Sequence, residues 1–193
     1  AATAKNRAGQ RPEVKPGTAD SPLTEARDTV ILADEAERLC TRLARHASPS
    51  IGFDLALDPS RERVRGNRLL LRELISHVLE SAVEGIDGDW GTITLMSGRT
   101  LAGRGHASEA HPIIVRPMEL REACWHFLEI HDSGSTLDPA DLLAARRGAA
   151  SRTRRARRLA VAGELARLLG GSLHLDSTPG CGTQALLLLP IRD

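Results

Sequence analysis

The chain has 193 residues, of which 41% are hydrophobic and 26% charged, and its formal net charge is +1. This near-neutral charge excludes a strong global field that would steer the chain toward nucleic acid or an anionic membrane. The length predicts one domain of ordinary size, and with two Trp, two Phe and no Tyr its core must be aliphatic.

The three cysteines share no metal-ligand spacing and are odd in number, which predicts free thiols in a reducing compartment: Cys40, Cys124 and Cys181. No apolar run approaches the roughly 18 residues of a membrane helix, and no signal-peptide pattern opens the chain. We therefore expect this part of the protein to be cytoplasmic. Because the chain begins with Ala1 rather than Met, we also expect a processed or excised fragment.

The first 22 residues contain three prolines and two glycines and show no apolar period, so they are predicted to be a flexible linker or arm. Residues 23–193 then form the folded domain. A short strand is predicted over 28–32, a helix over 34–47 and an alternating strand over 51–57.

A central helix is predicted from Asn67 to Gly85, because apolar residues recur there at helical spacing. Glu73, His77 and Ser81 lie four residues apart and form a polar column on its other face. An ordinary solvated helix shows the same pattern, so this column gains significance only from motifs further along the chain.

The second half of the chain begins with a strand at 91–96, and a long mobile loop is predicted after it over 97–110. The remaining predicted elements are an extra strand at 113–115, a strand at 122–130, a turn and short helix from 137, a helix at 159–169, and strands at 173–176 and 184–189. This order predicts an α/β fold, specifically a two-layer α+β sandwich with helices on one face of a mixed β-sheet.

Seven arginines and no acidic residue lie between Arg146 and Arg158. We interpret this run as a solvated basic face or a partner surface, with direct phosphate contacts as the alternative. A nucleic-acid or acidic-partner binding module is a further hypothesis. It ranks last, because the run has no interleaved aromatic residues for base stacking.

Several motifs in this order resemble the ATP-binding catalytic domain of two-component sensor histidine kinases, which has the Bergerat fold of the GHKL ATPases. The central helix resembles the N-box, His131-Asp132-Ser133-Gly134 resembles the first glycine box, and residues 178–183 resemble the closing Pro-Gly-x-Gly-Thr turn. The resemblance covers residues 24–191.

The adenine end of the family's pocket is matched by three residues. The resemblance implies that Asp132 accepts a hydrogen bond from the adenine amino group, that Gly134 lets the backbone approach the base, and that Thr183 supports the ring. The alternatives are that Asp132 only caps the turn at Gly134 and that Thr183 only opens a strand.

The phosphate end departs from the family. Its N-box asparagines fall on His77 and Ser81, and Ser81 matches a magnesium ligand. A serine hydroxyl and an imidazole are weaker choices for Mg²⁺ than an amide oxygen. His77 also matches the catalytic glutamate of gyrase-type relatives, so a general-base role is one alternative. Thr136 stands where the glycine box would continue.

The lid of the family's pocket would also be altered. Its glycines fall on Arg154, Ala156 and Arg158, which cannot freely adopt the positive φ angles of a phosphate-binding nest. No histidine lies in the acceptor context His-Glu/Asp-x-x-x-Pro, and residues 1–22 are too short for a dimerising hairpin.

These departures predict a degenerate, pseudokinase-like relative in a two-component system. ATP binding would be weak or lost and Mg²⁺ binding doubtful. The domain would work in a phosphorelay by contact with a kinase dimerisation core or a response regulator, without touching the membrane. The alternative is an active histidine kinase domain, transferring phosphate from ATP to a protein histidine through atypical phosphate contacts.

Overall fold

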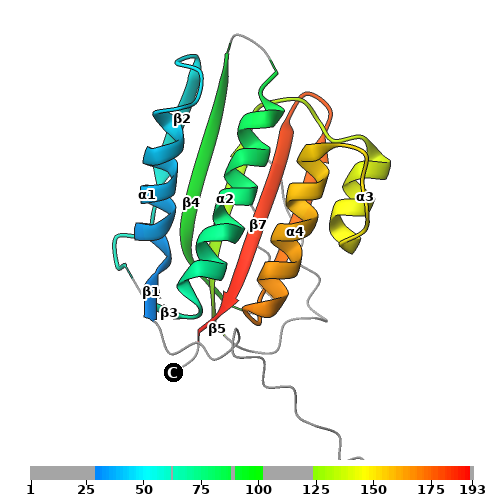
Figure 1. The fold of residues 1–193 in the computed structure, drawn as a ribbon. Helices are drawn as coiled ribbons and strands as arrows, with labels where there is room; N and C mark the ends of the chain where they lie inside the picture. Colours follow the sequence, from blue (N-terminus) through cyan, green and yellow to red (C-terminus); the bar gives the residue numbers. More distant parts are fainter. Residues whose placement is uncertain (1–28, 62, 88–89, 102–123, 192–193) are drawn as a thin grey trace, which may run out of the picture.

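The computed structural model describes residues 29–61, 63–87, 90–101 and 124–191, and these form a two-layer sandwich (Figure 1). One layer is a five-stranded mixed sheet, in which only the first two strands are parallel. Across the sheet the strands are β2 (Ile51–Ala56), β4 (Gly91–Leu101), β5 (Cys124–Asp132), β7 (Gly182–Pro190) and β6 (Ser172–Thr178).

The other layer consists of helices on one face of this sheet. They are α1 (Leu32–Ala44), α2 (Arg68–Gly85) and α4 (Arg154–Leu168), with α3 (Pro139–Arg147) beside α4 at the edge (Figure 1). Two short strands, β1 (Thr29–Ile31) and β3 (Arg63–Arg65), pair antiparallel as a separate sheet. The predicted two-layer α+β architecture is therefore confirmed.

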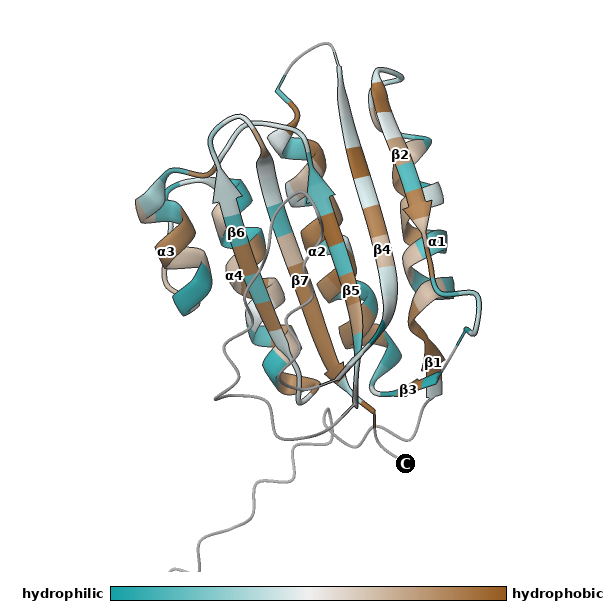
Figure 2. Cartoon of the chain, turned by 180° about the vertical axis from the view of Figure 1, so that it is seen from behind, coloured by the Kyte–Doolittle hydropathy of each residue, from teal (hydrophilic) through white to brown (hydrophobic). Residues whose placement is uncertain are grey.

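The core is aliphatic, as the composition predicted. Its largest fully buried side chains come from both layers: Leu71, Leu74, Ile75, Leu79, Ile93, Leu95, Leu128, Leu159, Leu187 and Leu189. Cys40 is a free, buried thiol in this core, and burial raises its pKa to about 11. A smaller apolar cluster of Phe127, Leu186 and Leu188 lies on the opposite face of the sheet. Every residue from 182 to 189 is therefore buried, and β7 is largely hydrophobic (Figure 2).

The central helix α2 begins and ends where the sequence predicted. The side-chain oxygen of Asn67 accepts hydrogen bonds from the backbone N–H groups of Leu69 and Leu70, at 2.9 and 3.3 Å. Such a cap satisfies N–H groups that have no partner within the helix. At its other end Gly85 adjoins the loop after β5, so α2 brings its last turn to the candidate site.

The loop predicted from residue 97 is wrong over its first five residues, which continue β4 to Leu101 and pair with β5. Residues 97–101 are mostly polar or glycine, so the sequence gives no sign of this extension. The apolar packing comes instead from the neighbouring strand, where the ring of Phe127 lies against Gly98. The rest of the predicted loop, the strand at 113–115 and the linker 1–22 fall outside the described residues. Strand β3 is a further element that the sequence did not predict. None of the helices in the described ranges is both long and apolar enough to cross a membrane.

Candidate functional site

The candidate site lies where the last turn of α2 meets the loop after β5. Asp132 ends β5 and is only 3% exposed. Its Oδ1 accepts a hydrogen bond from the Gly134 N–H at 3.0 Å. The backbone N–H and hydroxyl of Ser135 both donate to the Gly85 carbonyl, at 2.6 and 3.1 Å. A Cβ at Gly134 would collide with this carbonyl, so only glycine lets the loop lie so close to the helix.

The space between these elements is filled by the side chain of Arg155, the second residue of α4. Its Nη2 donates to Asp132 Oδ2 at 2.7 Å, and its Nε donates to the Ser81 carbonyl at 3.0 Å. Its Nη1 donates to the Ser135 carbonyl. A Cβ at Gly85 would overlap the guanidinium. Both oxygens of the Asp132 carboxylate are therefore occupied by groups of the chain itself.

Asp132 and Arg155 form a buried ion pair, with side chains 4% and 9% exposed. Burial raises the pKa of Asp132 above its ordinary value, and the attraction of the Arg155 guanidinium opposes this effect only in part. A buried charge that loses its partner is strongly destabilising. The Arg155 guanidinium therefore compensates the charge of the buried Asp132 carboxylate.

The start of α4 is held in place by the junction with α3. The Thr153 side chain caps the helix by accepting from the Ala156 N–H at 3.4 Å. The Thr153 and Ser151 hydroxyls donate to the two oxygens of Asp141, at 2.9 and 2.5 Å. These hydrogen bonds lower the pKa of Asp141. The anchored junction directs Arg155 toward Asp132.

The interpretation of the 146–158 run as a solvated basic face is wrong for Arg155, which is buried, and for Arg158, whose side chain is only 24% exposed. Arg158 donates to Glu84 at 2.9 Å and pairs with Glu80, and Arg154 lies 2.8 Å from Glu84. Glu80 and Glu84 of α2 face the first turns of α4, which the sequence alone could not show. Arg146 donates to the Leu175 carbonyl at 2.9 and 2.6 Å.

Of the predicted phosphate-end residues, Ser81 is only 1% exposed, and its carbonyl is already bound to Arg155. His77 lies one turn earlier on α2, and its buried Nδ1 has no hydrogen-bond partner in the described part of the chain. The nearby carboxylates of Glu80 and Glu84 are committed to arginines. Within the described ranges no three His, Cys, Asp or Glu residues converge on a metal position. This donor set does not suit Mg²⁺, which requires accessible oxygen ligands.

Thr183 lies beside Asp132, since the two residues are partners in the β5–β7 register. Its hydroxyl is 2.9 Å from the Ser177 hydroxyl, which also accepts from the Leu137 N–H at 2.9 Å. Thr183 therefore helps to hold the loop after β5. The structure thus brings Asp132, Gly134, Thr183 and Ser81 together, while the Nδ1 of His77 forms no hydrogen bond with any of them.

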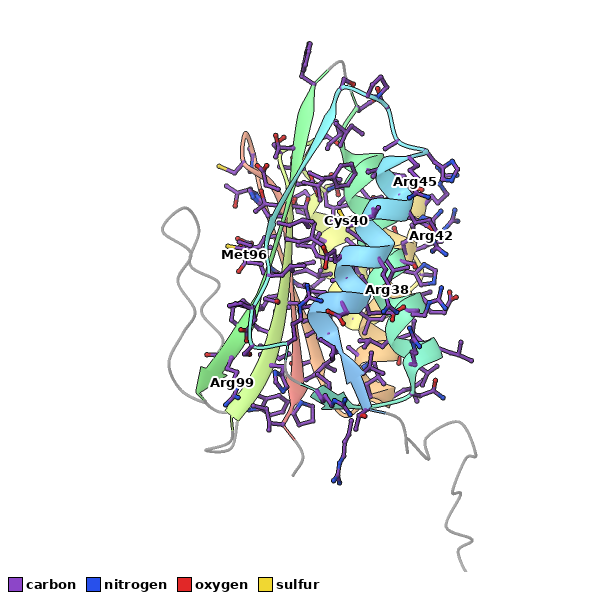
Figure 3. All side chains as sticks on the ribbon, turned by 90° about the vertical axis from the view of Figure 1, so that its left-hand side faces the viewer. Arg38, Cys40, Arg42, Arg45, Met96 and Arg99 are labelled. Carbon is purple, nitrogen blue, oxygen red and sulfur yellow. The ribbon has the colours of Figure 1, made fainter. Side chains whose placement is uncertain are left out.

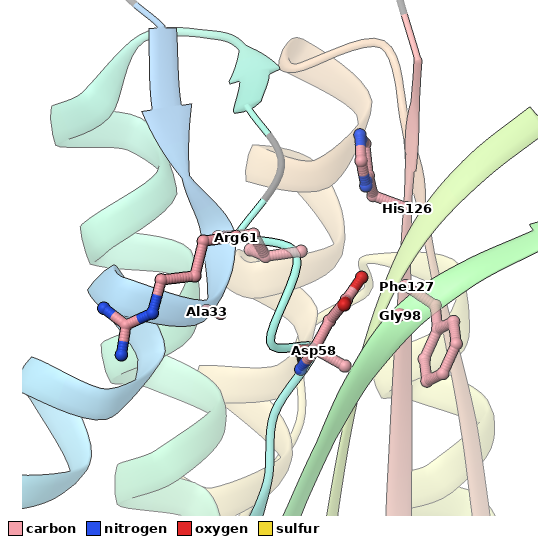
Figure 4. Close-up of a pocket in the computed structure, with 8 residues that line it drawn as sticks. Ala33, Asp58, Arg61, Gly98, His126 and Phe127 are labelled. Carbon is pink, nitrogen blue, oxygen red and sulfur yellow. Dashed lines mark hydrogen bonds between the residues drawn. The ribbon is translucent and has the colours of Figure 1, made fainter.

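Arg155 is the residue of the candidate site that sequence reasoning missed. Its sequence signal is faint: an arginine in a run of arginines, 23 residues from its carboxylate partner. A second location, near the turn between β2 and β3, includes Asp58, Arg61 and His126 (Figure 4). Its cavity of about 10 Å³ has room for roughly one water molecule and cannot hold a nucleotide.

The strand order and the helix-covered face define the fold of a histidine kinase ATP-binding domain, and several solved structures share it. The mycobacterial sensor histidine kinase MprB has a TM-score of 0.61 and 20% identity, over 84% of this chain and 96% of that one. Full-length ShkA in complex with AMPPNP has a TM-score of 0.61 and 16% identity, over 84% of this chain, which spans 30% of ShkA.

The catalytic domain of histidine kinase ThkA gives a TM-score of 0.56 at 16% identity, over 82% of this chain and 90% of that domain. No family model matches the sequence, and no curated protein is significantly similar to it. The predicted resemblance is confirmed at the level of the fold. At these identities the likeness carries over the architecture alone.

Proposed function

We propose that this chain is a histidine-kinase-type domain of a two-component system that works by protein contact without using ATP. The observation that carries this proposal is the Asp132–Arg155 pair. The resemblance assigns adenine recognition to the Asp132 carboxylate, and Arg155 already holds that carboxylate from within the fold. A purine could reach Asp132 only after the guanidinium had left.

The cost of displacing Arg155 is large. Breaking a buried ion pair by removing one partner costs about 3–5 kcal/mol. Since each 1.4 kcal/mol is a factor of about ten in a dissociation constant, adenine would bind roughly a hundred- to several-thousandfold more weakly than to an open site. An ordinary nucleotide affinity would thereby fall into the millimolar range.

The lid supports the same proposal. Arg154, Ala156 and Arg158, which match the lid glycines of the family, all lie in the first two turns of α4. Their backbone is helical and cannot form a glycine nest around phosphates. Because Glu80 and Glu84 of α2 are paired to arginines, neither carboxylate is free for Mg²⁺ at the phosphate end, among the residues that the structure describes. Weak or absent binding of ATP and Mg²⁺ follows from both ends of the site.

The domain would then act through its surface on another component of the pathway. The partner class we propose is a kinase dimerisation core or a response regulator, the two components with which histidine-kinase-type domains act. The domain's contribution would be to dock, position or inhibit such a partner, rather than to transfer a phosphoryl group.

Isothermal titration with AMPPNP, with and without Mg²⁺, tests the proposal, and ShkA provides the positive control because it has been seen in complex with AMPPNP. We expect no saturable binding by the present chain up to about 1 mM nucleotide, a concentration at which only about 4 kcal/mol of binding free energy is needed. Saturable, Mg²⁺-dependent binding in the micromolar range would overturn the proposal in favour of an active kinase domain.

A further inference from the structure

A groove of about 340 Å³ lies between α1 and α2, on the side of α2 away from Arg155. Its apolar part comes from Leu39 and Leu43 of α1 and from Leu79 of α2. Its polar residues are Arg42 on α1, His46 in the turn after α1, and Ser76 and Glu80 on α2. The groove therefore combines an aliphatic floor with polar rims.

The α1 rim of this groove is cationic. Arg38, Arg42 and Arg45 recur at helical spacing on the side of α1 that is turned away from the sheet (Figure 3). Arg38 is 63% exposed at its side chain, and its nearest carboxylate, that of Glu35, is 3.9 Å away. Within the part of the chain that the structure describes, Arg42 and Arg45 form no ion pair. Two of the three charges are therefore available to a partner.

The α2 rim does not cancel this charge. Its one carboxylate, that of Glu80, is already paired with Arg158 of α4. The acidic residues of α1 are also engaged with the chain itself: Glu35 binds Arg68 and Arg72 at 3.1 and 3.0 Å, and Asp34 binds Arg61 at 2.6 Å. The groove therefore presents net positive charge beside its apolar floor.

The geometry points to an acidic amphipathic α-helix of a partner protein as the occupant of this groove. Seven residues separate Arg38 from Arg45, which is about 10 Å along a helix, or two turns. A helix with acidic residues three or four positions apart would meet this column while an apolar side chain on its inner face covered Leu43. Leu39 and Leu79 are only 4% and 1% exposed, so the apolar contact would centre on the partly buried Leu43, and the arginines would set orientation and speed of association.

This inference rests on the proposed function, because it specifies the kind of partner that a contact-only domain would bind. The groove and Arg155 lie against different flanks of α2, so occupancy of the groove requires no change at Asp132. The two ideas can therefore fail separately in experiment.

The test uses a fluorescein-labelled helical peptide with leucines along one face and glutamates beside them, titrated into the full chain. A control peptide carries glutamine in place of every glutamate. Anisotropy measures binding to the wild type and to Arg42→Glu, Arg45→Glu and Arg147→Glu, the last an exposed position on α3 outside the groove. Thermal melting confirms that each variant is folded.

We expect the glutamate peptide to bind the wild type and Arg147→Glu equally, and the two groove variants at least about tenfold more weakly at low ionic strength. Salt should reduce this difference. Equal binding of both peptides, or equal losses in all three variants, would overturn the inference. A Ser76→Phe variant, which fills the groove without altering its charge, should also weaken binding, and its failure to do so would place the peptide elsewhere.

Sedimentation of the free chain tests whether a second copy is the occupant instead. A concentration-dependent dimer that Arg42→Glu dissolves would overturn the assignment to a partner helix, and a monomer supports it. AMPPNP titration of the same samples separates the two proposals. AMPPNP binding would reject the proposed contact-only function. If no AMPPNP binds but the glutamate and glutamine peptides bind equally, only the inference about the groove is rejected.

Discussion

Replacing Arg155 by alanine should open the candidate site to adenine. The substitution removes the group that binds Asp132 Oδ2 at 2.7 Å, together with its donors to the Ser81 and Ser135 carbonyls. A ligand no longer has to break the buried pair, which costs about 3–5 kcal/mol. Adenosine should therefore bind Arg155→Ala about a hundred- to several-thousandfold more tightly than it binds the wild type.

The same substitution should destabilise the free protein. It leaves the Asp132 carboxylate buried without a cation, so we expect a loss of about 3–5 kcal/mol, within the 5–15 kcal/mol that typical domains possess. Because burial already raises the pKa of Asp132, the variant should recover stability as acid protonates this group. A double variant with Asp132→Asn should lose less than the single one, since no buried charge remains.

Adenosine titration by calorimetry and urea unfolding at several pH values provide the measurements. Arg147→Ala is the matched control, because it removes an exposed arginine from α3. Adding Asp132→Asn to Arg155→Ala should abolish the gained adenosine binding. If folded Arg155→Ala gains no affinity, or if the gain survives Asp132→Asn, Arg155 does not block a purine position and the assignment of this site is wrong.

Three further predictions concern the elements that build the fold and the site. Gly134→Ala should lower the free energy of urea unfolding by up to about 3 kcal/mol, because its Cβ meets the Gly85 carbonyl. The control Gly163→Ala has open space around its Cβ in α4 and should raise the free energy of unfolding by up to about 1 kcal/mol. Equal effects of the two substitutions would contradict the described packing. Asn67→Ala should lose about 1 kcal/mol by removing the cap of α2, and an unchanged unfolding midpoint would refute that role. Burial, aided by Arg99, lowers the pKa of His126 below its unfolded value of 6.5. The stability that neutral His126 contributes to the folded state is therefore complete above pH 6.5 and is lost as the pH falls through the lowered pKa. Thermal melting between pH 7.5 and 5 should show this loss of stability, and His126→Gln should reduce the loss.

The sequence predicted the parts of the fold that local chemistry specifies. Apolar spacing defined α2 to within one residue, and the predicted strand at 122–130 led directly to Asp132. Strand β4 was predicted too short because residues 97–101 owe their conformation to pairing with β5 and to the Phe127 ring at Gly98. Such nonlocal support leaves no periodic signal in the strand itself.

The residues of the candidate site could be predicted from the sequence, but the ion pair that closes the site could not. The motifs located Asp132, Gly134 and Thr183, and the structure brings all three to one place. The partner of Asp132 was not predictable, because choosing Arg155 among seven neighbouring arginines requires the direction of each side chain on α4. The charge pairing between α2 and α4 likewise depends on how the two helices are placed side by side.

An occupant that belongs to the chain differs from a dissolved ligand in one thermodynamic respect. A dissolved ligand stabilises a protein in proportion to the logarithm of its concentration, so the stability of a nucleotide-binding domain follows the supply of nucleotide. The guanidinium of Arg155 is tethered through its own backbone and is never diluted. A domain closed in this way would keep the same stability in a starving cell as in a growing one, and its surface would be equally ready for a partner in both.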